Sequence, residues 1–251
     1  MKQIIVNADD FGINETVTAE IEKQILLGNV SSTTVMANGA CLDEVKHFAV
    51  QHPEVSFGVH LCLSEFDSLT KSNSLMHAGL IGEDGVFIHK AVFELKGFIS
   101  EAVKNAIRDE LNAQIDVVTA LGFTISHADS HHHVHTIYPL KEVFADVLRR
   151  RGINRVRLGS DFRTIRMKLH ARKWLQRNNL NKYYKRLFTT TDGFYSYAEF
   201  VEAGCPMNNR EIIELMCHPG HLGLDYRNEI DLVEKNIIPR EIKLITYNDI
   251  Y

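Results

Sequence analysis

Short apolar segments alternate with amphipathic ones along most of the chain. Lys2–Val6 predicts a buried strand, and the segment after it places Val17, Ile21 and Ile25 four residues apart, which is the spacing of one helix face. Further strands are predicted at Val30–Ala37, Val55–Leu63, Phe123–Ala128, Val156–Leu158, Ile212–Met216 and Ile242–Thr246. Further helices are predicted at Leu42–Val50, Glu101–Leu121, Leu140–Arg151 and Glu229–Asn236. Strands that alternate with helices indicate parallel βαβ units.

The length and the strand ends favour a barrel over an open sheet. A chain of 251 residues has the usual size of a (β/α) barrel, in which active-site residues follow the strands. Four of the predicted strands end on Asp or His residues, although fewer than eight strands are evident. We therefore expect an α/β fold, an irregular TIM-like (β/α) barrel of parallel strands, formed by residues 1–251 as a single domain. His60 lies on the polar face of Val55–Leu63, which points inward only if the barrel closes.

The composition excludes several classes of protein. With 45% hydrophobic and 24% charged residues the chain is not disordered, and a formal charge of -4 argues against nucleic-acid binding as its main role. No apolar run approaches the ~18 residues that a membrane helix needs. The first residues reach Asp9 without an apolar signal segment, and the four cysteines form no CxxC pair. We expect a reduced, cytoplasmic protein that binds neither nucleic acid nor a membrane.

A basic stretch interrupts the alternation. Asp161–Arg186 carries nine Lys or Arg residues and a single acid. The plainer interpretation is a solvated helix packed on the barrel. The alternatives are a helical lid or rim insertion over residues 161–190, or a contact between the subunits of a homodimer.

Two adjacent acids, Asp9 and Asp10, follow the first predicted strand. Neighbouring carboxylates repel each other, and a metal ion resolves the conflict by binding one and leaving the other free as a base. The alternative is a helix N-cap with a spare acid.

Histidines are concentrated after the fourth predicted strand. The chain has 13 histidines, and four of them lie within His131–His135. If strand geometry continues, His131, His133 and His135 share one face with Asp129, and His132 faces away. Neutral imidazole is a ligand suited to Zn, Ni or Fe. The alternative is an adventitious metal-binding tract, and His60 or His218 taken alone could be a buried structural histidine.

Together these residues fit a hydrolytic metal site. A carboxylate and two imidazoles from separate strand ends would leave positions open for water and substrate. A free acid would then take a proton from water, and a histidine on the opposite side would protonate the leaving amine. Arg157 would orient the base. These parts suit the hydrolysis of an amide or an ester.

Six ordered motifs resemble those of a known family. IIVNADDFG, STTVMANG, GVHL, HADSHHHVH with Pro139, VRLGS and ELMCHPG occur in the order in which they appear in the YdjC-like carbohydrate deacetylases. That family includes the chitooligosaccharide deacetylases. The match runs from residue 3 to about residue 220 and weakens in Asp161–Arg186 and beyond His221.

The resemblance implies a function and assigns roles to residues. It implies one divalent metal ion, Mg or Zn, held by Asp10, His60 and His131. It also implies that Asp9 is the general base and His218 the general acid. The supporting or substrate-binding residues would be Arg157, His133 and Asn38. The expected reaction removes the N-acetyl group of an acetylated amino-sugar oligosaccharide and releases acetate.

Two alternatives remain at this stage. The first is a metallohydrolase of the same barrel that acts on another amide or on a phosphoester. The second is a non-catalytic metal-binding protein. Asp9 discriminates against the second, because a storage site has no use for an unliganded acid beside its metal.

Overall fold

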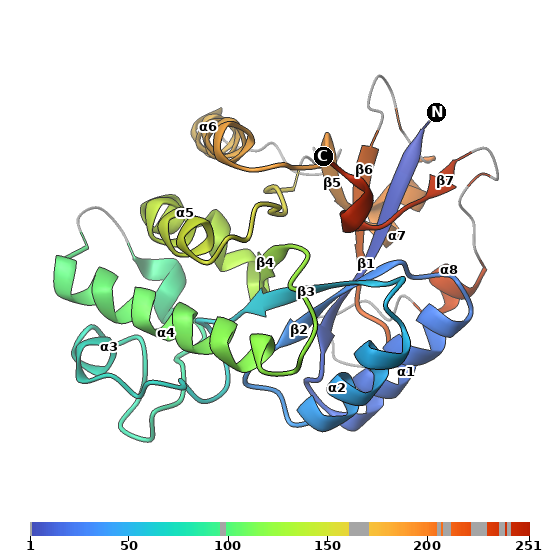
Figure 1. Ribbon diagram of the computed structural model, residues 1–251. Coiled ribbons are helices and arrows are strands. Elements are labelled where there is room, and N and C mark those ends of the chain that lie inside the picture. Colours follow the sequence, from blue (N-terminus) through green and yellow to red (C-terminus); the bar gives the residue numbers. More distant parts are fainter. Residues whose placement is uncertain are drawn as a thin grey trace.

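A parallel sheet forms the centre of the molecule (Figure 1). The computed structural model describes residues 2–95, 99–160, 171–204, 207, 212–221, 230–235, 239 and 242–251. Within these residues the strands are β1 Gln3–Phe11, β2 Ser32–Met36, β3 Ser56–Leu61, β4 Ala128–Ser130, β5 Gly193–Ser196, β6 Ile212–Cys217 and β7 Lys243–Leu244. Their order is β4-β3-β2-β1-β6-β5, with β7 paired to the start of β1, and every pair is parallel.

The sheet curls into a half-barrel, which confirms the predicted parallel α/β, barrel-like fold. Isolated parallel bridges continue it beyond β4, from Ala128 to Val156 and from Arg155 to Thr189. Thr189 lies shortly before β5, the strand at the opposite edge of the sheet. Of the predicted strand Val156–Leu158, only Val156 takes part in these bridges, next to Arg155.

Helices surround the sheet. They are α1 Glu15–Leu26, α2 Leu42–Gln51, α3 Asn73–His77, α4 Glu101–Thr119, α5 Lys141–Arg150, α6 Ala171–Leu187, α7 Tyr197–Glu202 and α8 Ile230–Glu234. Short 3-10 helices lie at Ala91–Glu94, His131–Thr136, Tyr138–Leu140 and Tyr247–Asp249. The α1 helix follows its sequence pattern: Val17, Ile21 and Ile25 are buried, and the Asn14 side chain accepts a hydrogen bond from the Val17 amide at its N-terminus.

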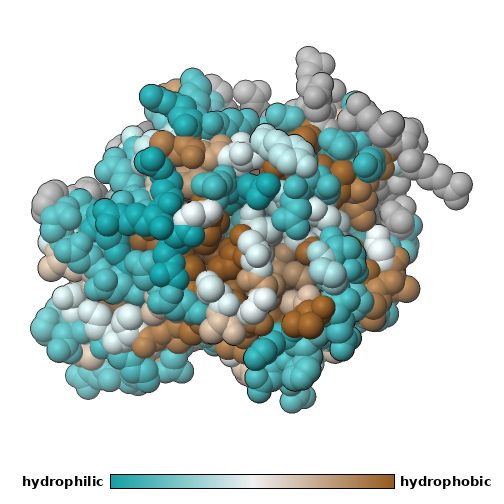
Figure 2. Space-filling view, viewed as in Figure 1, coloured by the Kyte–Doolittle hydropathy of each residue, from teal (hydrophilic) through white to brown (hydrophobic). Residues whose placement is uncertain are grey.

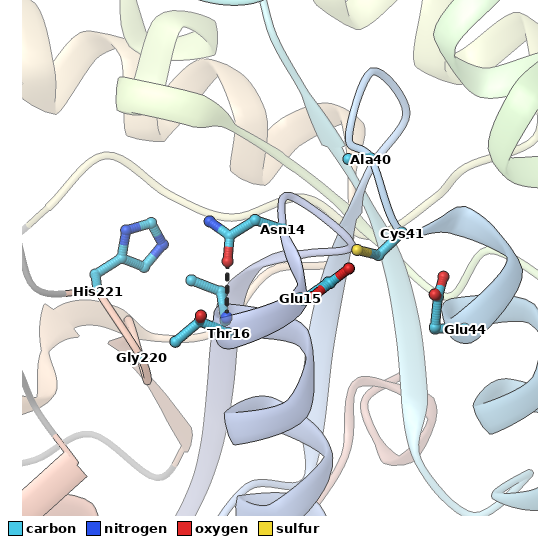
Figure 3. A pocket seen from close by; sticks show the side chains of 9 residues that line it. Asn14, Glu15, Thr16, Ala40, Cys41, Glu44, Gly220 and His221 are labelled. Carbon is cyan, nitrogen blue, oxygen red and sulfur yellow. Dashed lines mark hydrogen bonds between the residues drawn. The ribbon is translucent and has the colours of Figure 1, made fainter.

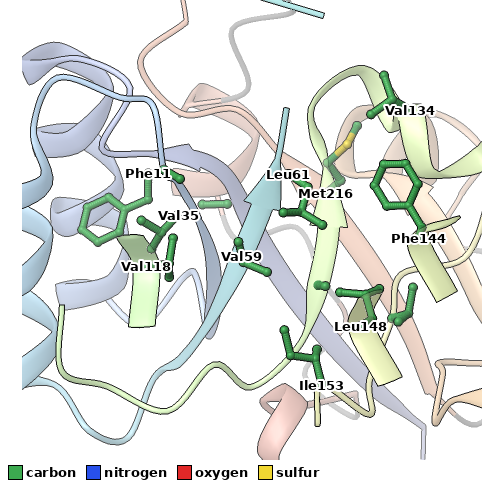
Figure 4. Close-up of a cluster of buried hydrophobic side chains, with 14 of the residues drawn as sticks. Phe11, Val35, Val59, Leu61, Val118, Val134, Phe144, Leu148, Ile153 and Met216 are labelled. Atoms are coloured by element: carbon green, nitrogen blue, oxygen red, sulfur yellow. The ribbon is translucent and has the colours of Figure 1, made fainter. Parts of the chain in front are cut away.

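The core lies between the sheet and these helices. Figure 4 shows Phe11, Val35 and Val118 on one side of β3, and Phe144 and Leu148 on the other. All of β3 is buried, as in a sheet covered on both faces. Figure 2 shows hydrophilic side chains over the region of α4 and α5, and hydrophobic ones between them and the centre of this face. Apolar side chains therefore pack against both sides of β3.

Three sequence predictions need correction. The Phe123–Ala128 strand is wrong, because β4 begins only at Ala128. The shared histidine face is also wrong: strand geometry ends at Ser130, and His131–Thr136 forms a 3-10 turn in which His132 (φ 51°) and His133 (φ 55°) are left-handed. The β1 strand continues to Phe11, well beyond Val6.

Part of the basic stretch, residues 161–170, lies outside the described residues. Ala171–Leu187 forms α6, so the stretch does contain a helix. The lid and homodimer interpretations remain predictions. In the part of the chain that the structure describes, no helix combines the length and apolar character needed to span a bilayer.

Candidate active site

The two adjacent acids lie at a break in the regular strand. The pairing of β1 with β2 shifts register between Ala8 and Phe11, and Asp10 has a left-handed backbone with φ 70°. In a regular strand, Asp9 and Asp10 would point to opposite faces of the sheet. The irregularity re-aims them, as bulges near active sites do, and both side chains are buried at the carboxyl edge.

Asp10 is surrounded by histidine nitrogens from three other segments. Its Oδ1 lies 2.8 Å from His131 Nδ1 and 3.1 Å from His60 Nε2. Its Oδ2 lies 3.1 Å from His221 Nε2, yet this buried oxygen has no partner with hydrogen-bond geometry in the described structure. A carboxylate that faces imidazole nitrogens from separate segments offers the N and O ligands that Zn²⁺ binds in proteins.

A carboxylate supports His60 from behind. Asp129 Oδ1 lies 2.6 Å from His60 Nδ1, and Thr34 donates a hydrogen bond to Asp129 Oδ2 at 3.1 Å. This pair fixes the ring so that Nε2 faces Asp10. Metal-binding histidines commonly have a carboxylate on the other nitrogen, because it orients the ring and raises its basicity.

Arg157 links the acids beneath the site. Its guanidinium donates to both oxygens of Asp9, at 2.6 Å each, and its Nη1 lies 2.6 Å from Asp129 Oδ2. Its Nε donates to Glu214 Oε1 at 2.7 Å, and the Tyr247 hydroxyl donates to the other oxygen of Glu214. Arg157 is completely buried. One cation therefore holds three carboxylates in fixed orientations.

Burial and neighbouring charges act against each other on the ionisable groups of the site. Burial alone would raise the pKa of Asp9, but the charge and hydrogen bonds of Arg157 hold that pKa well below its usual range. Burial would likewise raise the pKa of Asp10. The charge and hydrogen bond of His131 outweigh this effect, so the pKa of Asp10 is also well below its usual range. Burial lowers the pKa of His131, but Asp10 raises it to about 10. Both acids are therefore ionised near neutral pH.

Two groups of donor atoms at this edge have the spacing of a metal site. In Asp10, His60 and His131, and again in Asp9, His60 and Asp129, the donor atoms lie within 4.8 Å of one another. Arg157 already lies between Asp9 and Asp129, so a second cation there would face its guanidinium. Asp10 faces the imidazoles of His60, His131 and His221 instead, and an imidazole can release its proton and bind a metal, whereas a guanidinium cannot. The first group therefore fits a divalent cation better than the second.

His218 and His221 follow the end of β6. His218 Nε2 lies 4.0 Å from Asp9 Oδ2, and the two histidine rings lie edge to face with their centroids 5.9 Å apart. His221 also lines a pocket of about 630 Å³, whose far wall contains Cys41 and Glu44 (Figure 3). The site thus opens toward this pocket through His221.

His133 and Asn38 have other surroundings than the Asp10 cluster. His133 lines a second pocket, of about 310 Å³, together with Tyr138 and Arg177. Burial lowers the pKa of His133 to about 3, so the ring is neutral. The Asn38 amide donates to the Asp67 carbonyl at 3.3 Å, which ties the end of β2 to a loop. The structure shows no contact of either side chain with Asp10 among the described residues.

Sequence reasoning missed several residues of the site. Glu65 contacts His131 Nε2 at 3.3 Å, although no motif marks it. His221 lies three positions after His218, and this spacing could have indicated a second histidine at the carboxyl edge of the sheet. Glu214 lies on a strand that was predicted, but its contact with Arg157 depends on tertiary structure. Asp129 belongs to a recognised motif, yet its position behind His60 does not follow from sequence.

Comparison with known proteins agrees with this arrangement. A sequence model of the YdjC-like protein family matches residues 3–241. The chain belongs to the YdjC-like family. This confirms the resemblance noted in the sequence. The match includes every residue of the Asp10, His60 and His131 cluster and the Asp9–Arg157 pair.

Relatives of this YdjC-like protein carry a consistent name. A carbohydrate deacetylase from Clostridium beijerinckii is 28% identical over 88% of this chain and 82% of its own length. Another, from Listeria welshimeri, is 28% identical over 99% of this chain and 93% of its own length.

One solved structure shares the fold closely. An Enterococcus faecalis protein described as a cellobiose-phosphate cleavage protein superposes with a TM-score of 0.75 at 23% identity, and covers 98% of both chains. A lactam utilization protein from Thermus thermophilus superposes with a TM-score of 0.52 at 11% identity over 97% of this chain and 99% of its own. These similarities concern the fold.

Proposed function

We propose that this YdjC-like protein is a metal-dependent deacetylase that removes the N-acetyl group from acetylated amino sugars of the chitooligosaccharide type. The observation that carries the proposal is the pairing of two unlike acids: Asp10 faces two histidines, and its neighbour Asp9 is held by Arg157. The deacetylase names of the relatives support the substrate class.

Asp10, His60 and His131 would hold the cation, which is Zn²⁺ or Mg²⁺. When bound, such a cation polarises a carbonyl oxygen and lowers the pKa of water toward ~7. Asp129 would keep the His60 ring in the required orientation and tautomer through their 2.6 Å contact. The buried negative charge of Asp10 favours a cation at this position.

Asp9 would act as the general base. It is ionised, and its two hydrogen bonds to Arg157 fix the direction in which it faces the site. A carboxylate with so low a pKa is a weak base. It accepts a proton efficiently only from water that has itself become more acidic, so the function of Asp9 depends on the loaded site. Arg157 acts by positioning Asp9.

His218 would act as the general acid. Its Nε2 lies 4.0 Å from Asp9 and its side chain keeps 17% of its surface exposed, so the ring can reach a substrate that enters from solvent. Breaking the amide expels an amine, which leaves readily only when it is protonated. A histidine across from the base supplies that proton and also collects it again near neutral pH.

The surroundings of the site suit a saccharide. The two pockets, of about 630 and 310 Å³, include His221 and His133 respectively. Asn14, Glu15 and Thr16 in the first, and Tyr138 and Arg177 in the second, offer polar groups to sugar hydroxyls. We propose that the N-acetyl group reaches Asp10 between these pockets.

Acetate release from diacetylchitobiose tests the proposal. Protein stripped with a chelator and then reloaded with Zn²⁺ or Mg²⁺ should release one acetate per cleaved amide, and the stripped protein should release none. The His218→Gln variant should bind the metal but turn over at least ~10²-fold more slowly. Full activity of the stripped protein would contradict metal dependence. No acetate from any acetylated amino sugar would contradict the substrate class.

A further inference from the structure

A second cluster of metal-ligand side chains lies on the outer side of His131. One donor atom each from Glu65, His89 and His132 lies within 4.8 Å of the others. These residues come from three separate segments: the loop after β3, the approach to the Ala91–Glu94 helix, and the His131–Thr136 turn. None of them belongs to the group proposed to hold the first cation.

The distances within the cluster suit a shared ion. Glu65 Oε1 lies 3.0 Å from His89 Nδ1 and 4.0 Å from His132 Nε2. Two atoms that are each ~2 Å from one tetrahedral ion lie about 3.3 Å apart, a value between these two distances. The rings of His89 and His132 are nearly perpendicular, at 86°, with centroids 4.7 Å apart. Two imidazoles and one carboxylate form a ligand set of the zinc type.

The backbone and a buried serine hold His132 in this position. Ser64 is completely buried, and its hydroxyl lies 3.0 Å from His132 Nδ1, on the ring nitrogen opposite to the one that faces Glu65. A polar partner on the second nitrogen is what orients a metal-binding histidine. His132 also has a left-handed backbone, with φ 51°, a conformation that is unfavourable for a non-glycine residue.

An ordinary surface ion pair explains less of this arrangement. Contact between His89 and Glu65 alone, with side chains 51% and 36% exposed, contributes little to stability, because solvent screens exposed ion pairs. It requires neither the Ser64 contact nor the left-handed turn at His132. The Ser64 contact and the left-handed turn together direct His132 Nε2 toward Glu65 Oε1, the oxygen that His89 also contacts.

We propose that Glu65, His89 and His132 form a second binding site for a divalent cation of the zinc type, coupled to the first site through Glu65. The other oxygen of Glu65, Oε2, lies 3.3 Å from His131 Nε2. A cation on Oε1 draws negative charge away from Oε2 and so weakens the support that Glu65 gives to His131. Occupancy of the outer site therefore lowers affinity at the inner one, and the coupling acts equally in both directions.

Zinc stoichiometry tests the second site without any substrate. Untagged protein is stripped with a chelator, equilibrated with Zn²⁺ and measured for bound zinc per chain. We expect two in the wild type, one in His89→Ala, one in His60→Ala, and none in the double variant. His47→Ala, which removes an exposed histidine of α2 that contacts the Asp43 carbonyl, should retain two.

The contrary results are equally specific. One zinc in the wild type, or two in His89→Ala, overturns the second site. His89→Gln repeats the test with a polar side chain, and far-UV circular dichroism confirms that each variant is folded. Because no acetylated sugar is used, a failure of the proposed deacetylase activity leaves this result unaffected. Conversely, an active enzyme that binds a single zinc refutes only the outer site.

The coupling has its own readout. Zinc affinity at the inner site, measured in His89→Ala, should be several-fold higher than the inner-site affinity of the wild type with the outer site filled. Identical affinities would refute the coupling through Glu65.

Discussion

Arg157 and Asp9 are joined by two parallel hydrogen bonds of 2.6 Å, and both residues are almost entirely buried. The same guanidinium contacts Asp129, which supports His60. The proposed base and the proposed metal ligand are therefore positioned by one side chain. The planar guanidinium of Arg157, with its five N–H donors, can hold several carboxylates at once in fixed directions, whereas the ammonium group of a lysine cannot.

Replacement of Arg157 by Lys should be strongly destabilising. Lys keeps the charge but cannot contact Asp9 and Glu214 in the same geometry, so buried carboxylates lose their partners. We expect the free energy of unfolding to fall by on the order of 3 kcal/mol, measured by denaturant titration. Arg151→Lys is the matched control, because Arg151 contacts Asp116 at the surface, and it should change stability by less than about 1 kcal/mol. Equal effects of the two substitutions would show that the buried contacts of Arg157 stabilise the fold no more than a surface ion pair does.

Asp9 and Asp10 should respond differently to the same substitution. Asp10→Asn removes the charge that attracts the cation, so the inner site should lose its metal. Asp9→Asn should retain that metal and lose ~10²-fold or more in turnover, because the proton acceptor is gone. Metal content and acetate release measured side by side check both results. If Asp9→Asn keeps its turnover, Asp9 is not the base.

Asp129→Asn should weaken metal binding without removing a ligand. The substitution replaces the carboxylate 2.6 Å behind His60 by a neutral amide, so the ring loses basicity and orientation. We expect inner-site affinity to fall about 10–100-fold, measured by competition with a chelator. Asp116→Asn serves as the control. Unchanged affinity in Asp129→Asn would contradict the supporting role of Asp129 behind His60.

The pH dependence of stability should contain a contribution from Glu214. Burial raises the pKa of Glu214 from 4.5 to about 7, so the folded protein holds a proton there that the unfolded chain has lost. This contribution to the free energy of unfolding is complete below pH 4.5 and decreases as the pH rises to about 7. It amounts to at most about 3 kcal/mol.

The contribution of Glu214 is measured by denaturant unfolding of the metal-free protein at about pH 5 and at about pH 7.5. Most of the Glu214 titration lies between these two pH values. Glu214→Gln should show a smaller loss of stability over that interval than the wild type. Glu142→Gln, on the exposed face of α5, should behave like the wild type. A wild-type slope in Glu214→Gln would assign the pH dependence to other groups.

The sequence predicted most where local pattern and tertiary structure agree. The apolar spacing of α1 and the β-branched run of β2 give elements that differ by only a few residues from the predicted ones. The motifs also brought Asp10, His60 and His131 into one hypothesis, and the structure places their donor atoms together.

Sequence pattern failed where the backbone leaves regular geometry. Alternation along a strand cannot reveal the register shift at Asp10 or the left-handed turn at His132, because both depend on packing around them. The sequence set His132 apart from the other histidines on the ground that it faces away along a strand, but His132 lies in a 3-10 turn with its Nδ1 3.0 Å from the Ser64 hydroxyl. Glu65 lies in an irregular loop, where periodicity carries no information.

The most direct test of the central claim is anomalous X-ray diffraction from crystals of zinc-loaded protein. The account predicts a peak bonded to Asp10, His60 and His131, with Asp9 hydrogen-bonded to Arg157 and outside bonding distance of the ion. An ion bonded to Asp9, or no peak among those three residues, would contradict it.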